Sequence, residues 1–335
     1  MERLLKSRYR IGDKIGESPF CVTYRGSYLD RNDPLIIKIY KRSVLSSSII
    51  KSVKKKVRAL CSLSHQNIAK VIDGDYGWQG FYFVRSFVSG RTLSDMVASE
   101  GKLSVETAER IITGVCEALS AAHSKGILHG ALNPDNVFID DSNAPVLTDF
   151  IIVGEMRAAV KERSEMMFSA SSFLSPEEIG GRVAGFSSDI YAAGLLLYYM
   201  LAGQNPLNGP TGLETSLKIL KETPVELRRT RGDVPDYLES IAFKAMEKDP
   251  LMRFRSVSDM LSSIKSRALK ADRLLGDEPC AINLEGIIDT AGTGESEAKI
   301  EQEEQRPNFL LAAVVIFIAA AVGIGYAVFT ALAGR

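Results

Sequence analysis

The residues with the clearest chemical pattern lie at 127–137, where the sequence is I-L-H-G-A-L-N-P-D-N-V. The spacing is typical of phosphoryl-transfer loops of the form H-R-D-L-x-x-x-x-N, in which the Asp accepts a hydroxyl proton and the Asn holds a magnesium ion. Here Ala131 stands at the position of the Asp, and a methyl group accepts no proton. Asn133 stands where such loops carry a Lys that steadies the transferred group. The frame of the loop is therefore present without its proton acceptor.

The first part of the chain, up to about residue 88, is predicted to build a small β-rich lobe. Short β-rich runs at 35–40 and 80–84 flank one stretch with helical spacing of apolar residues. The apolar stripe of that stretch consists of Leu45, Ile49, Val53, Val57 and Leu60.

After Leu93 the pattern becomes mainly helical, with the clearest helices predicted at 105–123, 189–201 and 235–247. The sequence thus indicates an α+β, two-lobed fold, with an N-lobe over about 9–88 and a larger helical C-lobe over about 89–268. We expect residues 1–268 to form one domain.

Composition places this domain in a reducing compartment and gives it a mild positive charge. The chain has 41 basic and 41 acidic residues, but nine acids and three bases fall in 277–335, so 1–276 carries 38 bases and 32 acids. The four cysteines lie far apart without a C-x-x-C pair, which argues against a zinc site or a disulfide framework. The charged N-terminus lacks the apolar core of a secretory signal.

The C-terminal region is predicted to anchor the protein in a membrane. Residues 309–333 form 25 consecutive residues without a charge, enough to cross a hydrocarbon core of about 30 Å as a helix. Residues 269–308 are acidic and Gly-rich, which is typical of a flexible linker. We expect a single-pass protein whose folded domain stays in the cytoplasm. A small-residue face of the span favours homodimerisation through Ala319, Gly323, Ala327 and Ala331.

Several ordered motifs between about Tyr9 and Ala268 resemble those of Hanks-type protein kinases, in particular bacterial membrane-bound serine/threonine kinases. They are I-G-E-S-P-F-C-V at 15–22, L-S-H-Q-N-I at 63–68, the loop at 127–137, L-T-D-F-I at 147–151, L-S-P-E-E at 174–178, S-D-I-Y-A-A-G at 188–194 and K-D-P-L-M-R at 248–253. Each motif is weak alone, but their order makes a chance agreement negligible.

The resemblance implies a nucleotide site in which some positions are kept and others are altered. Gly16, Val22 and Lys38 correspond to nucleotide-binding positions, while Ser18 and Cys21 replace two glycines of the phosphate loop. The helix residue expected to be a Glu that holds Lys38 is Lys56, and no Glu occurs between Glu17 and Glu100.

The resemblance also implies a metal pair, an altered base pocket and a set of structural residues. Asn136 and Asp149 correspond to the magnesium ligands, so ATP and magnesium stay open as cofactors. Arg85 falls at the usually apolar position behind the adenine, where it would pair with Asp149 or point away. The positions that hold the fold together are mostly kept, namely Leu60, His129, Phe150, Glu177, Asp189 and Arg253.

The function favoured by these residues is that of a catalytically inactive pseudokinase, anchored in a membrane, which binds a partner protein or acts as an adaptor beside an active kinase. Two alternatives stay open. One is a weak or unconventional serine/threonine kinase that uses the retained Lys38, Asn136 and Asp149, and the other is an ATP sensor that transfers no phosphate. No motif supports nucleic-acid binding.

Overall fold

The computed structural model describes residues 3–18, 21–41, 47–77, 80–150 and 172–269. The chain divides into two compact units, residues 1–274 and 275–335, and the described residues belong to the first. The predicted linker at 269–308 and the predicted span at 309–333 lie outside the described residues, apart from residue 269. Among the helices that are described, none is long and apolar enough to cross a membrane.

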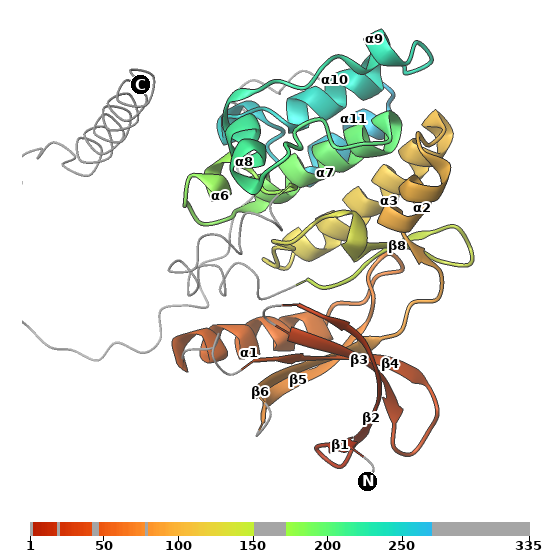
Figure 1. The fold of residues 1–335 in the computed structure, drawn as a ribbon, viewed down its shortest axis with the longest axis vertical. Helices are drawn as coiled ribbons and strands as arrows, with labels where there is room; N and C mark the ends of the chain where they lie inside the picture. Colours follow the sequence, from red (N-terminus) through yellow and green to blue (C-terminus); the bar gives the residue numbers. More distant parts are fainter. Residues whose placement is uncertain (1–2, 19–20, 42–46, 78–79, 151–171, 270–335) are drawn as a thin grey trace, which may run out of the picture. The chain divides into compact units, whose positions relative to one another are not determined.

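The N-terminal part is a six-stranded antiparallel sheet with one helix packed against it (Figure 1). The strand order is β1-β2-β3-β4-β6-β5. The strands are β1 (Arg3–Leu5), β2 (Tyr9–Glu17), β3 (Cys21–Tyr28), β4 (Pro34–Tyr40), β5 (Val71–Gly77) and β6 (Gly80–Ser86).

Helix α1 (Ser47–Cys61) lies between β4 and β5 in the chain and packs on the sheet through one apolar face. Val53, Val57 and Leu60 are buried at i, i+4 and i+7, which is the spacing of one helical face. The close packing is visible at Gly74 of β5, where an added Cβ would come within 3.0 Å of Val57. Leu45 and the side chain of Ile49, the first two members of the predicted stripe, lie outside the described part.

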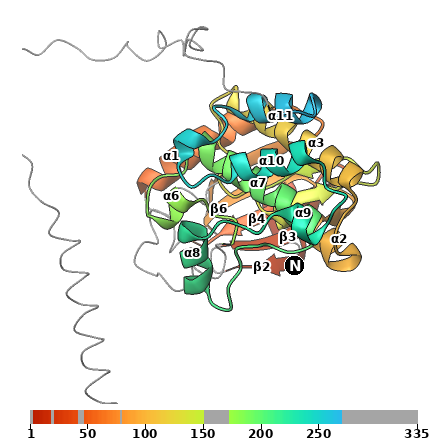
Figure 2. The same cartoon turned by 90° about the horizontal axis from the view of Figure 1, so that it is seen from above.

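The C-terminal part is mainly helical and is organised around α7 (Phe186–Ala202), which is buried along most of its length. Helices α3 (Val105–His123), α10 (Asp236–Ala245) and α11 (Val257–Lys265) pack around it (Figure 2). Gly194 permits this packing, because an added Cβ would come 2.5 Å from the Cβ of Ala245.

The remaining elements of this part are short. They are α2 (Leu93–Glu100), α6 (Pro176–Ile179), α8 (Gly212–Lys221), α9 (Leu227–Thr230), the 3₁₀ turns η2 (Pro134–Asn136) and η3 (Pro250–Met252), and a three-stranded sheet of β7 (Arg91–Thr92), β8 (Val137–Ile139) and β9 (Pro145–Leu147).

The two parts share one hydrophobic core, and this junction positions the candidate site. Ala69 donates a hydrogen bond to the carbonyl of Leu147 (2.9 Å), and Leu147 donates to the carbonyl of Asn67 (2.8 Å). The same core cluster contains Leu60 of α1 and Phe150, which follows β9. The β-rich and helical parts are therefore joined by backbone pairing as well as by apolar packing.

The predicted division into a β-rich N-terminal part and a helical C-terminal part is confirmed. The helix at 105–123 has the predicted bounds, and those at 189–201 and 235–247 are shifted by one to three residues at each end. The short strands β8 and β9 were not predicted, because three-residue segments carry too little periodicity to stand out from a loop.

Candidate functional site

The loop at 127–137 is held in place by Asp189, which lies in the first turn of α7. Its carboxylate accepts hydrogen bonds from the backbone amides of His129 (2.8 Å) and Gly130 (2.9 Å) and contacts Nε2 of His123 (2.8 Å). Burial alone would raise the pKa of Asp189, but the hydrogen bond from His123 and the nearby imidazole of His129 hold that pKa below its usual value. Asp189 thus anchors the loop backbone as an ionised group.

Within this anchored loop, two asparagine amides hold the backbone at Ala131. The carbonyl of Ala131 accepts hydrogen bonds from the side chains of Asn133 (3.0 Å) and Asn136 (2.8 Å). Asn133 also caps η2, since its Oδ1 accepts from the amides of Asp135 (2.9 Å) and Asn136 (3.2 Å). Both asparagines therefore have structural partners within the loop itself.

Two carboxylates line the small cavity beside Ala131, and both have other partners. The cavity is lined by Ala131 together with Glu178 and Asp189. Glu178 accepts from the amide (3.0 Å) and the hydroxyl (2.8 Å) of Ser175 at the start of α6. Because Asp189 holds the loop backbone and Glu178 binds Ser175, both carboxylates of this cavity are engaged in structural contacts.

A cluster of three charges, one buried and two partly buried, lies where the β-rich and helical parts meet. Nζ of Lys38, on β4, is 2.6 Å from Oδ2 of Asp149, which follows β9. Nε of Arg85, on β6, is 3.4 Å from Oδ1 of the same carboxylate, and the Arg85 side chain is only 6% exposed. Of the two arrangements expected for Arg85, the structure has the one in which it faces Asp149. We call Lys38, Asp149 and Arg85 the charge cluster.

Within the charge cluster, Lys38 forms a hydrogen bond to Asp149, whereas the contact of Arg85 with Asp149 is electrostatic only. Burial alone would raise the pKa of Asp149, but the two cations hold it well below its usual range. Nε of Arg85 and Oδ1 of Asp149 are close enough for attraction, yet neither atom has a hydrogen-bond partner. Asp149 also has a positive φ of 61°, a strained conformation for a residue other than glycine. Packing of the surrounding residues must therefore hold Asp149 in place.

In the candidate phosphate loop, residues 15–22, backbone groups of the two strands bind one another. Gly16 pairs with Thr23, and Glu17 pairs with Val22, across β2 and β3. The amide of Ser18 donates to the carbonyl of Cys21 (2.8 Å), and the amide of Cys21 donates to the hydroxyl of Ser18 (3.1 Å). Residues 19 and 20, at the tip of this loop, lie outside the described part. The two amides next to the tip are thus already hydrogen-bonded within the loop.

Lys56, which stands at the position expected for the helix Glu that holds Lys38, lies on α1 and is partly exposed. Its charge is near enough to His129 to help lower the pKa of that imidazole, after the larger effect of burial. The structure pairs Lys38 with Asp149, so the contact that the resemblance assigns to a helix Glu is replaced by one to a different carboxylate.

Besides Asp189, the residues expected to hold the fold together lie in two places. The ring of His129 lies 4.4 Å from that of Phe150, centroid to centroid, in the core that also holds Leu60. In the helical part, Arg253 is fully buried and donates to both carboxylate oxygens of Glu177, at 2.8 and 2.7 Å. Burial would raise the pKa of Glu177, but the hydrogen bonds from Arg253 and Ser188 lower it to about 2.

His123 is a functional contact that the sequence analysis missed, since it supports Asp189 from the last turn of α3. Its signal was the position of a histidine at the end of the helix that precedes the loop.

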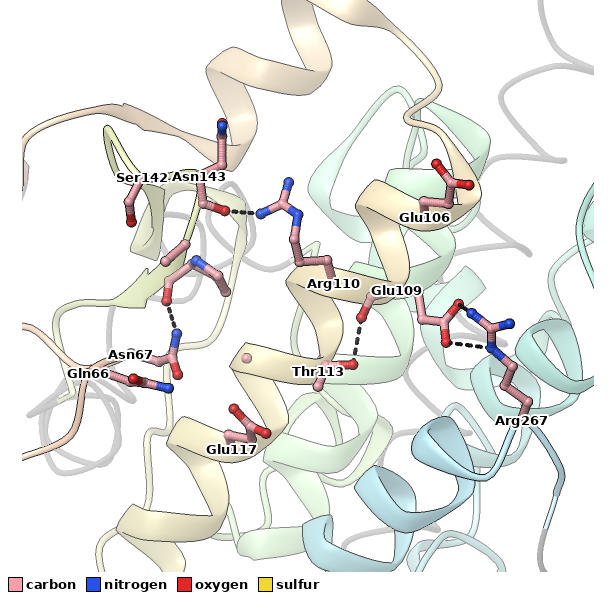
Figure 3. A pocket seen from close by; sticks show the side chains of 13 residues that line it. Gln66, Asn67, Glu106, Glu109, Arg110, Thr113, Glu117, Ser142, Asn143 and Arg267 are labelled. Carbon is pink, nitrogen blue, oxygen red and sulfur yellow. Dashed lines mark hydrogen bonds and ion pairs between the residues drawn. The ribbon is translucent and has the colours of Figure 1, made fainter.

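Among the described residues, no group of three or more His, Cys, Asp or Glu side chains is placed to hold a metal ion. A separate cavity of about 520 Å³ lies along α3, between the β8–β9 turn and Arg267 (Figure 3). It contains no residue of the charge cluster or of the loop at 127–137.

The buried imidazole of His129 should make stability depend on pH. Burial lowers its pKa from 6.5 to about 4, so between these values the unfolded chain binds more protons than the folded one. Stability should therefore fall as pH is lowered from 6.5 towards 4, by up to roughly 3 kcal/mol. We expect His129→Phe to flatten this slope in urea unfolding between pH 7 and 5, above the range in which the lowered carboxylate pKa values contribute. An unchanged slope in the variant would contradict a neutral His129.

Comparison with known proteins identifies a protein kinase domain over residues 9–266. Similar proteins include the probable serine/threonine-protein kinase PknB of Lactococcus lactis, 32% identical over 84% of this chain and 45% of its own length. The serine/threonine-protein kinase PrkC of Bacillus subtilis is 28% identical over 95% of this chain and 52% of its length. A probable serine/threonine-protein kinase of Clostridium perfringens is 27% identical over 78% of this chain and 38% of its length. The chain thus spans about half the length, or less, of these curated relatives.

Proposed function

The chain belongs to the protein kinase family, with bacterial serine/threonine kinases as its relatives, and we propose that it transfers no phosphate and acts by binding another protein. In this proposal the domain is a scaffold that keeps kinase architecture and presents it to a partner. An active kinase of the same family is the class of partner that we favour.

The observation that carries the proposal is Ala131 in a loop that is otherwise anchored. Asp189 binds the loop backbone, and the asparagines at 133 and 136 fix the carbonyl of Ala131. The loop is thus held in a defined conformation, and a methyl group stands at the position of the proton acceptor. General-base assistance accelerates proton transfer by about 10² to 10⁴-fold. The two carboxylates that line the cavity beside Ala131 have structural partners, which supports loss of that assistance.

The charge cluster argues against ATP and magnesium as resident ligands. Arg85 and Lys38 both face Asp149, so a magnesium ion would have to compete with one buried and one partly buried cation for the same carboxylate. Asn136, the second expected metal ligand, donates its amide nitrogen to the carbonyl of Ala131, a bond that does not use the Oδ1 with which an asparagine binds a metal. The competition of the two cations for Asp149 is thus the observation that supports a chain without a resident magnesium–nucleotide complex.

We further propose that residues 309–333 anchor the domain to a membrane, with 269–308 as its linker and the domain on the cytoplasmic side. The support is the run of 25 uncharged residues, which satisfies the length requirement of a spanning helix. A dimer contact through Ala319, Gly323, Ala327 and Ala331 is part of the same proposal.

The test is a phosphotransfer assay with radiolabelled ATP and magnesium on the purified full-length chain. We expect label transfer, to itself or to a generic substrate, at the background given by a Lys38→Met variant. PrkC of Bacillus subtilis, named as a kinase, is the positive control. Transfer above the Lys38→Met background would reject the proposal in favour of a weak kinase.

A thermal-shift titration with ATP, with and without magnesium, separates the remaining alternative. We expect no shift of the melting temperature in either condition, because a ligand that binds only the folded state would raise it. A concentration-dependent shift without phosphotransfer would select the ATP sensor.

A further inference from the structure

Helix α1 carries a stripe of basic side chains on the face opposite to the one that packs on the sheet. The helix contains five basic residues and no acidic residue. Lys51, Lys55 and Arg58 are exposed and are spaced i, i+4 and i+7, so they lie along one side of the helix. Each of them precedes a residue of the buried apolar stripe by two positions, a rotation of about 200° around the helix axis. The basic stripe therefore faces solvent.

Two lysines from other elements extend this stripe at the C-terminal end of α1. Nζ of Lys70 donates to the carbonyl of Cys61 (2.9 Å), and Nζ of Lys125 donates to the carbonyl of Ser62 (3.1 Å). Cations are stabilised at this end of a helix by its dipole. Both lysines are exposed, and an ammonium group has three donors, so each can still bind a further acceptor. We call the five side chains the basic face: Lys51, Lys55, Arg58, Lys70 and Lys125.

The positive charge of the basic face is not neutralised by its surroundings. Within the described ranges, none of its members takes part in an ion pair. Two acids, Asp73 and Asp75, lie beside Arg58 in a cavity between α1 and β5. Asp75 pairs with Lys6 and Lys54, and Asp73 accepts hydrogen bonds from two tyrosine hydroxyls. Lys6 and Lys54 match these two acids in number, so the acids do not offset the five charges of the basic face.

The composition of the basic face favours an extended anionic surface over a single phosphorylated side chain. Phosphorylated side chains are typically held by clusters of arginines, whose planar groups bind them through paired hydrogen bonds. The basic face has one arginine and four lysines, which act as flexible point charges. The cavity beside Arg58 is lined by two carboxylates, which would repel an anion that entered it. A layer of lipid headgroups needs no such pocket, because it is attracted by charge spread along an exposed face.

We propose that the basic face docks the domain on the anionic headgroups of the membrane to which the chain is anchored. This inference rests on the membrane anchor proposed above. The proposed linker, residues 269–308, has about 40 residues, and a flexible chain of that length has a mean reach on the order of 35 Å. Such a tether holds the domain at a high local concentration near the bilayer, whose cytoplasmic surface is negatively charged. Docking through α1 then determines which faces of the domain stay available to a partner protein.

Lysine acetylation of the full-length chain in nanodiscs tests this proposal. The discs contain either phosphatidylcholine alone or equal parts of phosphatidylcholine and phosphatidylglycerol, and mass spectrometry gives the acetylation rate of each lysine. Lys55 and Lys70 should react about threefold more slowly in the anionic discs, because the headgroups cover them. The exposed Lys102 and Lys221 lie outside the basic face and correct for any effect of the lipid on the reagent. In about 1 M salt, where the Debye length is about 3 Å, the difference should disappear.

Charge reversal tests whether the basic face itself makes the contact. The double variant Lys55→Glu/Arg58→Glu should return the acetylation rate of Lys70 in anionic discs to its value in neutral discs. The matched control, Arg229→Glu/Arg255→Glu, changes the net charge equally at two exposed arginines of the helical part and should keep Lys70 protected. The exchange Lys55→Arg/Arg58→Lys keeps the charge and should also keep the protection. All four positions are exposed, so each variant should melt close to the wild type.

Several outcomes would overturn the proposal. One is equal acetylation of the basic face in the two kinds of disc, and another is an equal loss of protection in the two charge-reversed variants. Protection by a synthetic phosphoserine peptide in neutral discs, with no effect of the anionic lipid, would assign the basic face to a phosphorylated protein instead. A chain that does not enter neutral discs would reject the anchor and the docking together, whereas entry without protection would reject the docking alone. None of these results depends on phosphotransfer.

Discussion

Arg253→Ala is expected to lower the free energy of unfolding by about 3–5 kcal/mol, because it removes one partner of a buried ion pair and leaves the other charge uncompensated. Arg253 is fully buried and donates to both oxygens of Glu177, to the carbonyl of Ser187 (2.8 Å) and to the carbonyl of Glu247 (2.8 Å). The substitution also leaves a cavity of nearly a whole side chain. Urea unfolding of the full-length chain, followed by circular dichroism, measures the effect.

The matched control is Arg267→Ala, which removes an exposed arginine that pairs with Glu109. Solvent and salt screen such a pair, so this variant should unfold close to the wild type. A loss of stability in Arg267→Ala as large as that in Arg253→Ala would mean that burial does not distinguish the two pairs. A stable Arg253→Ala protein would show that the helical part relaxes around the lost side chain.

Asp149→Asn should be the second strongly destabilising change, at about 3–5 kcal/mol, because Lys38 and Arg85 would then face each other without an anion. Asparagine keeps the shape of the side chain and tolerates a positive φ, so the difference reports the charge. In a protein whose aspartate serves only a bound metal, the same substitution would cost activity and leave stability nearly unchanged.

A double-mutant cycle isolates this contribution. Arg85→Met alone leaves the Lys38–Asp149 pair intact and should cost less than Asp149→Asn. Combined with Asp149→Asn, it removes the repulsion between the two cations, so the double variant should be more stable than the sum of the two single changes predicts. Additive free energies would show that Arg85 and Asp149 do not interact, contrary to their 3.4 Å separation.

Much of the fold could be predicted from the sequence because its elements carry strong periodic or motif signals. The stripe Val53, Val57 and Leu60 indicates a helix with one buried face, and the structure buries all three. The motif at 188–194 points to a loop anchor at Asp189, and the carboxylate does bind the loop backbone.

The side-chain contacts of the site could be predicted less well from the sequence, because the partner of a side chain can come from a distant part of the chain. Lys38 and Asp149 are 111 residues apart, and the position of Arg85 left two outcomes open until the fold fixed one of them. The burial of α8 could not be read from its sequence either, because the i, i+4, i+7 spacing of its three leucines would ordinarily predict that they lie inside, whereas the structure exposes them.

The charge cluster has a consequence for regulation. It ties β4 and β6 to the segment after β9 by side chains alone, across the junction where family members close around their nucleotide. The contacts of this cluster are made entirely by side chains of the protein itself, and under the proposed function no nucleotide is needed to form them. We therefore expect its output to follow how much of the protein is made and where it is delivered, and to be insensitive to the energy state of the cell.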